Sequence, residues 1–157
     1  MALGIESDMA SDSVLIEPAT AEVLDEVFAI EQACFSAPWT RKMLAAELSG
    51  NQFAQFLIAK CPDPGSGALV IAGYFCFWIV FEEVRLMNLA VLAPFRRQGV
   101  ARRLVCTALR AGLERGASRA MLEVRASNQE ALTLYHRLGF RRTATRTRYY
   151  VNPDEDA

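Results

Sequence analysis

The chain changes character within residues 88–103, which read Asn88-Leu-Ala-Val-Leu-Ala-Pro-Phe-Arg-Arg-Gln-Gly-Val-Ala-Arg-Arg103. An apolar run ends at Pro94, and a basic turn containing Gly99 opens into a helical pattern. Backbone N–H groups at a helix start have no partner within the helix and carry the positive end of its dipole, so amides converging there can hold a pyrophosphate. Gly99 allows close approach of the anion, and the small Ala101 keeps the first turn uncrowded. The pattern therefore predicts a strand, a phosphate-binding turn and a helix.

Arginines in and beside this turn add forked donors that suit phosphate oxygens: Arg96, Arg97, Arg102 and Arg103. Taken alone, however, the pattern R-x-x-G-x-A fits an ordinary strand-turn-helix with a solvated helix about equally well. It is also not the dinucleotide fingerprint G-x-G-x-x-G, because Gly99 is the one glycine present. The rest of the sequence has to decide between the two interpretations.

The length of 157 residues fits one domain, and a hydrophobic fraction of 52% is too high for a disordered chain. The four cysteines are Cys34, Cys61, Cys76 and Cys106, and they form no C-x-x-C pair. With His136 as the one histidine, no zinc site has a recognisable spacing, so we predict no metal. We expect free thiols in a reducing compartment.

Residues 1–13 are acidic and lack the pattern of a secretory signal, so we expect a disordered tail there. The longest apolar run, residues 69–81, is too short to cross a membrane as a helix. We therefore expect a cytoplasmic protein with no membrane partner. Its single domain would cover residues 14–151, and residues 152–157 would form an acidic tail.

The two halves of the chain differ in charge. Residues 1–84 hold three basic and twelve acidic side chains, whereas residues 85–157 hold fourteen arginines and six acids. This asymmetry predicts an anionic ligand on the second half and a basic partner for the first. Nucleic acid is the alternative explanation of the basic half. We predict no nucleic-acid partner, because the arginines are spread over several elements rather than gathered in one stripe with stacking aromatics.

Hydrophobic periodicity and turn residues predict an α+β domain. We expect strands at 14–18, 52–60, 69–80, 84–92, 120–125 and 140–150, and helices at 20–34, 40–50, 100–115 and 129–138. Tight connections predict an antiparallel meander for the second to fourth strands. The helix at 100–115 should make a right-handed crossover, so strands 84–92 and 120–125 should be parallel. Ser127 to Glu130 reads as a capping box for the following helix.

This order of motifs resembles the GCN5-related N-acetyltransferase (GNAT) family. The resemblance rests on R-x-x-G-x-A, on the run Leu122-Glu-Val-Arg-Ala-Ser-Asn128, on A-L-x-L-Y and on L-G-F. Three further pieces, Phe35 with Pro38-Trp39, the 122–128 run and Tyr149-Tyr150, resemble the bacterial RimI branch, which acetylates the N-terminal alanine of ribosomal protein S18. The resemblance to the GNAT family implies a mostly antiparallel sheet with helices on both faces. A central parallel strand pair would splay to form the acetyl-CoA cleft.

The resemblance also implies residue roles around acetyl-CoA. The backbone of Leu89, Ala90 and Val91 would pair with the pantetheine arm, and Asn128 would bond that arm. The pyrophosphate would lie on the turn formed by Arg97, Gln98, Gly99, Val100, Ala101 and Arg102. The acceptor would contact Phe35, Pro38, Trp39 and Tyr149, although Trp39 fits a core plug equally well.

Glu123 matches the family's general base and Tyr135 its general acid. The chemistry agrees, since an α-amine is largely protonated at neutral pH and must lose a proton, while the departing thiolate must gain one. A structural alternative for Glu123 is an ion pair with Arg125 or another arginine, and for Tyr135 a core position. The N–H of Val91 or Leu92 could stabilise an oxyanion.

The predicted reaction is acetyl transfer from acetyl-CoA to the N-terminus of a basic protein, with S18 as the favoured acceptor. Acetylation of a small-molecule amine or an internal lysine is the alternative enzyme function, and a non-catalytic acyl-CoA-binding module is the alternative of another class. The sequence departs from the family in two respects. Its glycine turn reads Arg-Arg-Gln-Gly-Val-Ala where relatives read closer to Q-R-R-G-L-G, so position 98 lacks an arginine for which Arg96 could compensate. Relatives also continue beyond the match to Glu155–Ala157 with a hydrophobic strand that this sequence lacks. We therefore expect the last sheet edge to be uncovered or covered in another way.

Overall fold

The computed structural model describes residues 13–151 and 153–157, so the expected tail lies outside the described residues except for Ser13. Five strands form one sheet. In spatial order they are β1 (Leu15–Pro18), β2 (Ala54–Pro62), β3 (Leu69–Val80), β4 (Glu83–Val91) and β5 (Arg119–Leu122). Neighbours are antiparallel except β4 and β5, which are parallel. The predicted mixed sheet is confirmed, with the parallel pair at one end of this order.

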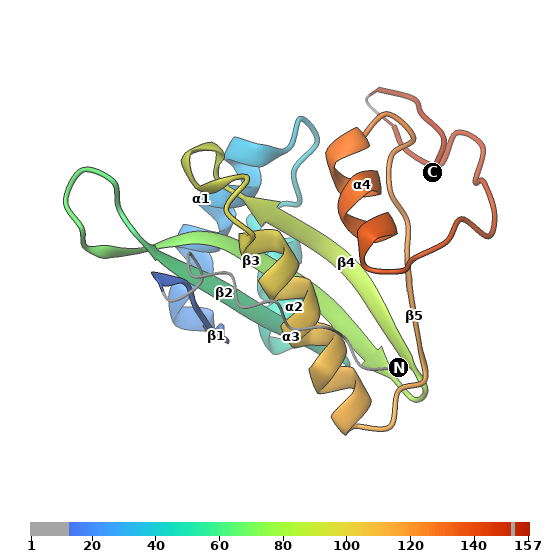
Figure 1. Cartoon of the computed structure of the whole chain (residues 1–157), viewed down its shortest axis with the longest axis horizontal. Helices are drawn as coiled ribbons and strands as arrows, with labels where there is room; N and C mark the ends of the chain where they lie inside the picture. Colours follow the sequence, from blue (N-terminus) through green and yellow to red (C-terminus); the bar gives the residue numbers. More distant parts are fainter. Residues whose placement is uncertain (1–12, 152) are drawn as a thin grey trace.

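The helices cover both faces of the sheet, as predicted (Figure 1). They are α1 (Leu24–Cys34), α2 (Arg41–Ser49), α3 (Val100–Glu114) and α4 (Gln129–Arg137), with short 3₁₀ turns η2 (Ala21–Val23) and η3 (Ala93–Phe95). Alternation along β3 divides the core, because successive side chains of a strand point to opposite faces. Tyr74 and Cys76 pack in the cluster beneath α1 and α2, and Phe75 and Phe77 pack in the cluster beneath α3.

Local capping explains where the helices begin. Thr40, where the helix at 40–50 was predicted to begin, is the N-cap of α2, and its hydroxyl accepts from the N–H of Met43 at 3.1 Å. The predicted capping box starting at Ser127 is wrong by one position. Asn128 is the N-cap of α4, and its side chain accepts from the N–H of Ala131 at 3.1 Å. An amide oxygen serves at this position as well as a hydroxyl does.

The predicted last strand, residues 140–150, is wrong for most of its length. Pairing near it is limited to one bridge, Tyr150 with Glu155, and to reciprocal main-chain bonds between Arg146 and Ala157. Alternating Arg and Thr residues do not form a strand without a partner ladder along their length. The acidic tail thus folds back onto the chain, and the outer edge of β5 has no strand partner among residues 13–151 and 153–157.

A prediction about stability follows from the close packing of α3 on β4. A Cβ added to Gly112 would lie 2.2 Å from Cγ2 of Val84. Gly112→Ala should therefore lower the free energy of unfolding by about 1–3 kcal/mol, the usual cost of overpacking, as measured by urea denaturation. Gly65→Ala is the control, since the atom nearest to its added Cβ, Oδ2 of Asp63, would be 3.4 Å away. Equal stability of both variants would contradict this packing.

Candidate active site

β4 and β5 pair over four residues and then part. The register runs from Glu83 opposite Arg119 to Leu86 opposite Leu122. Beyond that point β4 continues to Val91 beside β3 alone, and the two chain segments diverge (Figure 1). The separation predicted from the sequence is therefore present, and it begins directly before Glu123.

The direction of the main-chain groups shows which atoms face this gap. In an antiparallel pair, alternate residues direct their N–H and C=O toward the partner strand. The N–H of Leu92 donates to the carbonyl of Ala72, so Leu92 and Ala90 are directed toward β3. Leu89 and Val91 are directed to the opposite edge. Of the two N–H groups considered for an oxyanion, that of Leu92 is thus already used, and that of Val91 is the candidate.

The gap is partly closed by two side chains at the carbonyl of Val91. Nε of Arg96 donates to this oxygen at 2.8 Å, and Sγ of Cys34 lies 3.6 Å from it. Arg96 was expected among the phosphate donors, but its guanidinium lies instead at the end of β4. A ligand that paired with the Val91 carbonyl would have to displace Arg96.

The basic turn has an anion-binding shape. Arg97 and Gly99 both adopt the left-handed region, with φ of 61° and 79°, and α3 begins at the next residue, Val100. Such alternation turns successive N–H groups toward one side and creates a concave donor site. A Cβ on Gly99 would meet no atom within 4 Å, so this side of the turn is open. Arg97, Gln98 and Arg102 are exposed around it, while Ala101 packs against the α3 core.

Arg103 takes a different role from the one expected. Its Nη1 donates to the carbonyl of Val14 at 2.8 Å and so connects α3 to the start of β1. The predicted phosphate set of four arginines is therefore reduced to Arg97 and Arg102. The other candidate donors to a phosphate are the backbone N–H groups of the turn.

Glu123 is neither buried nor unpaired. Its side chain is 34% exposed and its Oε1 lies 3.0 Å from Nη2 of Arg146. The partner is thus an arginine other than Arg125. A hydrogen bond to Glu123 is also the main cause of the raised pKa of Tyr149. The carboxylate is held by two residues of the irregular segment before the acidic tail.

Tyr135 lies on α4 among apolar neighbours. It packs against the α3 core, and its ring meets that of Phe140 edge-on at 5.6 Å between centroids. Burial, with a smaller contribution from Tyr150, raises the pKa of Tyr135 to about 12. The phenol therefore stays protonated at neutral pH, as a proton donor must. It combines the core position and the chemical property that the sequence left as alternatives.

The start of α4 lies close to the basic turn. Asn128 uses its side-chain oxygen to cap α4, which leaves its amide NH₂ as the group available to a ligand. Nη2 of Arg97 lies 3.9 Å from Oε1 of Glu130, and both side chains are largely exposed. This ion pair is weak, and it marks the two elements as neighbours.

One residue near the site was missed from the sequence. Glu31 was not singled out in the sequence, and it is 1% exposed. Its carboxylate accepts from the N–H of Trp39 at 2.8 Å, from Nδ2 of Asn88 at 2.8 Å, and from the hydroxyl of Tyr74. Its spacing could have indicated burial, because Glu31 follows Leu24 by seven residues and Val27 by four and so lies on the same face of the helix.

The predicted acceptor loop is attached by that carboxylate. Phe35 and Trp39 are half-buried and pack against the α1–α2 core cluster, while Pro38 is exposed. Trp39 is therefore a core plug. Tyr149, the fourth predicted acceptor residue, lies with Glu123 and Arg146.

Comparison with known proteins decides the family. The model of the acetyltransferase (GNAT) family matches residues 24–140. The chain belongs to this family. It is 34% identical over 136 residues to the ribosomal protein bS18-alanine N-acetyltransferase of Escherichia coli K12, covering 85% of this chain and 86% of the relative. It is also 34% identical over 140 residues to the enzyme of the same name from Haemophilus ducreyi, covering 89% and 91%.

Solved structures agree with the fold of this acetyltransferase. The crystal structure of the E. coli S18-alanine N-acetyltransferase gives a TM-score of 0.78 at 29% identity, covering 91% of this chain and 88% of that one. Arabidopsis thaliana NAA60 in complex with acetyl-CoA gives 0.79 at 18% identity, covering 92% and 94%. The second likeness concerns the fold alone.

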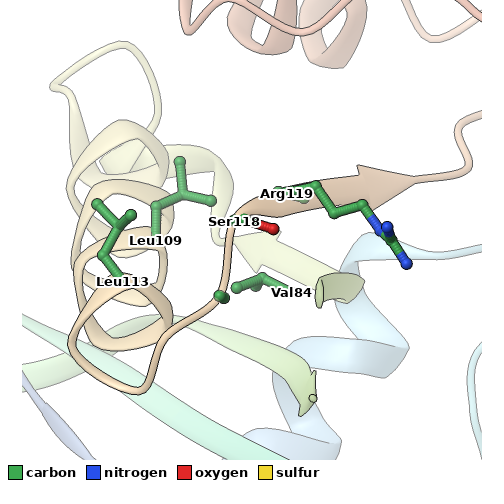
Figure 2. A pocket seen from close by; sticks show the side chains of 7 residues that line it. Val84, Leu109, Leu113, Ser118 and Arg119 are labelled. Carbon is green, nitrogen blue, oxygen red and sulfur yellow. The ribbon is translucent and has the colours of Figure 1, made fainter. Parts of the chain in front are cut away.

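A hollow on the surface lies away from this gap. It measures about 210 Å³ and lies between α3 and the start of β5, where Leu109 and Leu113 project from the helix and Arg119 points away (Figure 2). Glu123 follows the other end of β5. Within the described part of the chain, no cluster of His, Cys, Asp and Glu could hold a metal ion, and no helix is long and apolar enough to cross a membrane.

The raised tyrosine pKa values predict alkaline sensitivity. Tyr135 and Tyr150 both have pKa values of about 12, above the ordinary 10.0. Above pH 10 the unfolded chain binds fewer protons than the folded chain. The contribution of these two phenols to the free energy of unfolding should therefore be fully present below about pH 10 and decrease toward pH 12. Urea denaturation at several pH values should show a smaller fall for Tyr135→Phe. Parallel curves would contradict burial of this phenol.

Proposed function

We propose that this chain is an acetyl-CoA-dependent N-α-acetyltransferase that modifies the N-terminal amine of a protein, with the N-terminal alanine of ribosomal protein S18 as its favoured acceptor. The observation that carries the proposal is the parting of β4 from β5. It leaves main-chain groups of Leu89 and Val91 facing a gap that begins beside Glu123. The names of the E. coli and H. ducreyi relatives support the choice of acceptor.

The described residues fit acetyl-CoA at two points. Leu89 and Val91 present strand-like donors and acceptors to the amides of the pantetheine arm, and the amide of Asn128 can bond the same arm. The open turn from Arg97 to Ala101 offers convergent N–H groups to the pyrophosphate, and Arg102 extends outward to pair with it. Arg96 would leave the Val91 carbonyl when the arm pairs there.

Glu123 would take the proton of the acceptor amine. In the structure its carboxylate already holds a cation, the guanidinium of Arg146, so an acceptor ammonium can replace one cation by another at the same oxygen. Loss of the proton to the carboxylate frees the nitrogen lone pair for the C–N bond. The carboxylate that takes the proton then lies where the substrate amine binds, as general-base catalysis requires.

Tyr135 would return a proton to the sulfur as the C–S bond breaks. Its raised pKa keeps the phenol protonated at neutral pH, so it has a proton to donate as the sulfur departs. The N–H of Val91 faces the gap and can donate to a carbonyl oxygen held there. Direct transfer needs no acyl-enzyme, and His136, the one imidazole, is exposed.

The acceptor loop and the charge of the chain support a protein acceptor. Phe35, Pro38, Trp39 and Tyr149 would line the acceptor's path. The excess of acids in residues 1–84 would favour the approach of a basic protein. All four cysteines are free thiols, which fits action in a reducing compartment such as the cytoplasm.

The direct test is mass spectrometry of an alanine-starting S18 peptide incubated with the protein and acetyl-CoA. We expect one added acetyl group on the α-amine, and none on the same peptide with a blocked N-terminus. Acetylation of the blocked peptide would favour internal lysines, and acetylation of small amines alone would favour the small-molecule function. Acetyl-CoA binding without transfer to any of these would favour the non-catalytic module.

The catalytic pair gives a second prediction. Glu123→Gln and Tyr135→Phe should each lower kcat by about 100-fold, the usual worth of a general acid or base, while calorimetry gives an unchanged Kd for acetyl-CoA. Arg125→Gln is the control beside them, because its guanidinium pairs with the tail rather than with Glu123. Unchanged turnover in both variants would remove these residues from the mechanism.

The turn gives a third prediction. Arg102→Gln should weaken acetyl-CoA binding by about tenfold, since a charge-assisted bond to phosphate is lost, and the loss should shrink at high salt. Arg115→Gln, at the other end of α3, is the matched control and should bind normally. Equal affinities of the two variants would contradict a pyrophosphate at the turn.

A further inference from the structure

Glu31 is a buried acid that the proposed chemistry does not use. Its carboxylate is 1% exposed and accepts three hydrogen bonds, from Trp39, Asn88 and Tyr74. All three donors are neutral, and no ion pair to Glu31 is found among residues 13–151 and 153–157. Burial and the neighbouring Glu31 raise the pKa of the Tyr74 phenol, which keeps it a donor.

Burying a carboxylate is costly, and an apolar residue of similar volume would often serve stability better. The three donors show what the carboxylate connects. Tyr74 and Asn88 belong to β3 and β4, whereas Trp39 belongs to the loop after α1. The N–H of Trp39 is therefore held to the sheet through this one side chain.

The place of this contact along β4 is informative. Asn88 lies in the half of β4 that β5 no longer pairs. One turn further along α1, Cys34 approaches the carbonyl of Val91. The end of α1 thus lies along the unpaired half of β4, and the loop that follows is fixed there.

We propose that Glu31 is a positioning residue for acetyl transfer: it fixes the loop of residues 35–39 beside the unpaired half of β4, and so sets the affinity for the acceptor rather than for acetyl-CoA. This inference rests on the proposed function. We expect separate effects on the two affinities because the residues concerned lie on opposite faces of the sheet. Glu31, Asn88 and Ala90 lie on the α1 face, whereas Leu89, Val91 and the start of α3 lie on the other.

The test is Glu31→Gln, which keeps the shape of the side chain. An amide NH₂ cannot accept, so at least one of the three donors loses its partner. We expect the KM for an S18 peptide to rise by about tenfold, the usual effect of losing a hydrogen bond to a charged group, and the KM for acetyl-CoA to stay within about twofold. Hydrogen exchange of residues 35–39 should accelerate, while exchange of α3 stays unchanged.

Glu83→Gln is the matched control. Glu83 is the other buried acid in the described chain, 8% exposed, and it lies at the paired end of β4. This variant undergoes the same chemical change and loses ion pairs to Arg85 and Arg119, so it reports a general loss of stability. Its KM for the peptide should match that of the unsubstituted protein.

Two outcomes would overturn the inference while leaving the proposed function intact. One is an active Glu31→Gln enzyme with an unchanged peptide KM, and the other is an equal rise of the peptide KM in Glu83→Gln. If Glu31→Gln does not fold, the unsubstituted protein still gives a result: the amide of Trp39 should exchange slowly although it lies in a loop, and fast exchange would overturn the inference. An unsubstituted protein that acetylates no N-terminal peptide would instead overturn the proposed function, and this inference with it.

Discussion

The short pairing of β4 with β5 is the constraint on which the site depends. At the paired end, the main-chain register joins residues 83–86 of β4 to residues 119–122 of β5. After Leu122 the chain is bonded to the acidic tail instead of to β4: the N–H of Ala126 donates to the carbonyl of Asp156 at 3.0 Å. One end is thus tied together and the other is held apart, so the gap belongs to the folded chain before any ligand arrives. A preformed gap spares the ordering cost of opening a sheet during binding.

The two acids beside this gap have opposite surroundings. Glu31 is desolvated and surrounded by neutral donors, which hold it in one geometry. Glu123 is partly exposed and paired with Arg146, a partner that solvent or an incoming cation can replace. Exchangeable pairing suits a group that must accept and release a proton, and fixed bonding suits a group that holds a loop. The environments, rather than the residue type, therefore separate the two proposed functions.

Local signals in the sequence were sufficient for most of the fold. The strand-turn-helix at residues 88–103, the parallel crossover and the Thr40 cap depend on glycine, proline, capping and periodicity, which act within a few residues. The predicted strand at 140–150 failed because a strand needs a partner, and the partner ladder is absent over most of that segment. The one-residue error at Asn128 arose because Ser and Asn compete for the same capping position.

The parts of the site that could not be predicted depend on distant contacts. Glu31 bonds residues 43 and 57 positions away along the chain, so its role becomes visible only once the sheet is in place. The same holds for Glu123, whose partner Arg146 comes from a segment with no periodicity to position it. The partner of a charged residue can be identified only from the tertiary structure, whereas the spacing of apolar residues predicts which face of an element is buried.

The basic second half has a different meaning in the folded chain than its net charge suggests. Arg85 and Arg119 pair with Glu83, and Arg125 pairs with Glu155. Arg96 and Arg103 donate to main-chain carbonyls. Many of the arginines thus bind other parts of the chain and are not available to a ligand. Arg97 and Arg102 are what remains at the turn. An anion there would depend on the left-handed backbone around Gly99 at least as much as on side-chain charge, which is why the position of one glycine was more informative than the count of arginines.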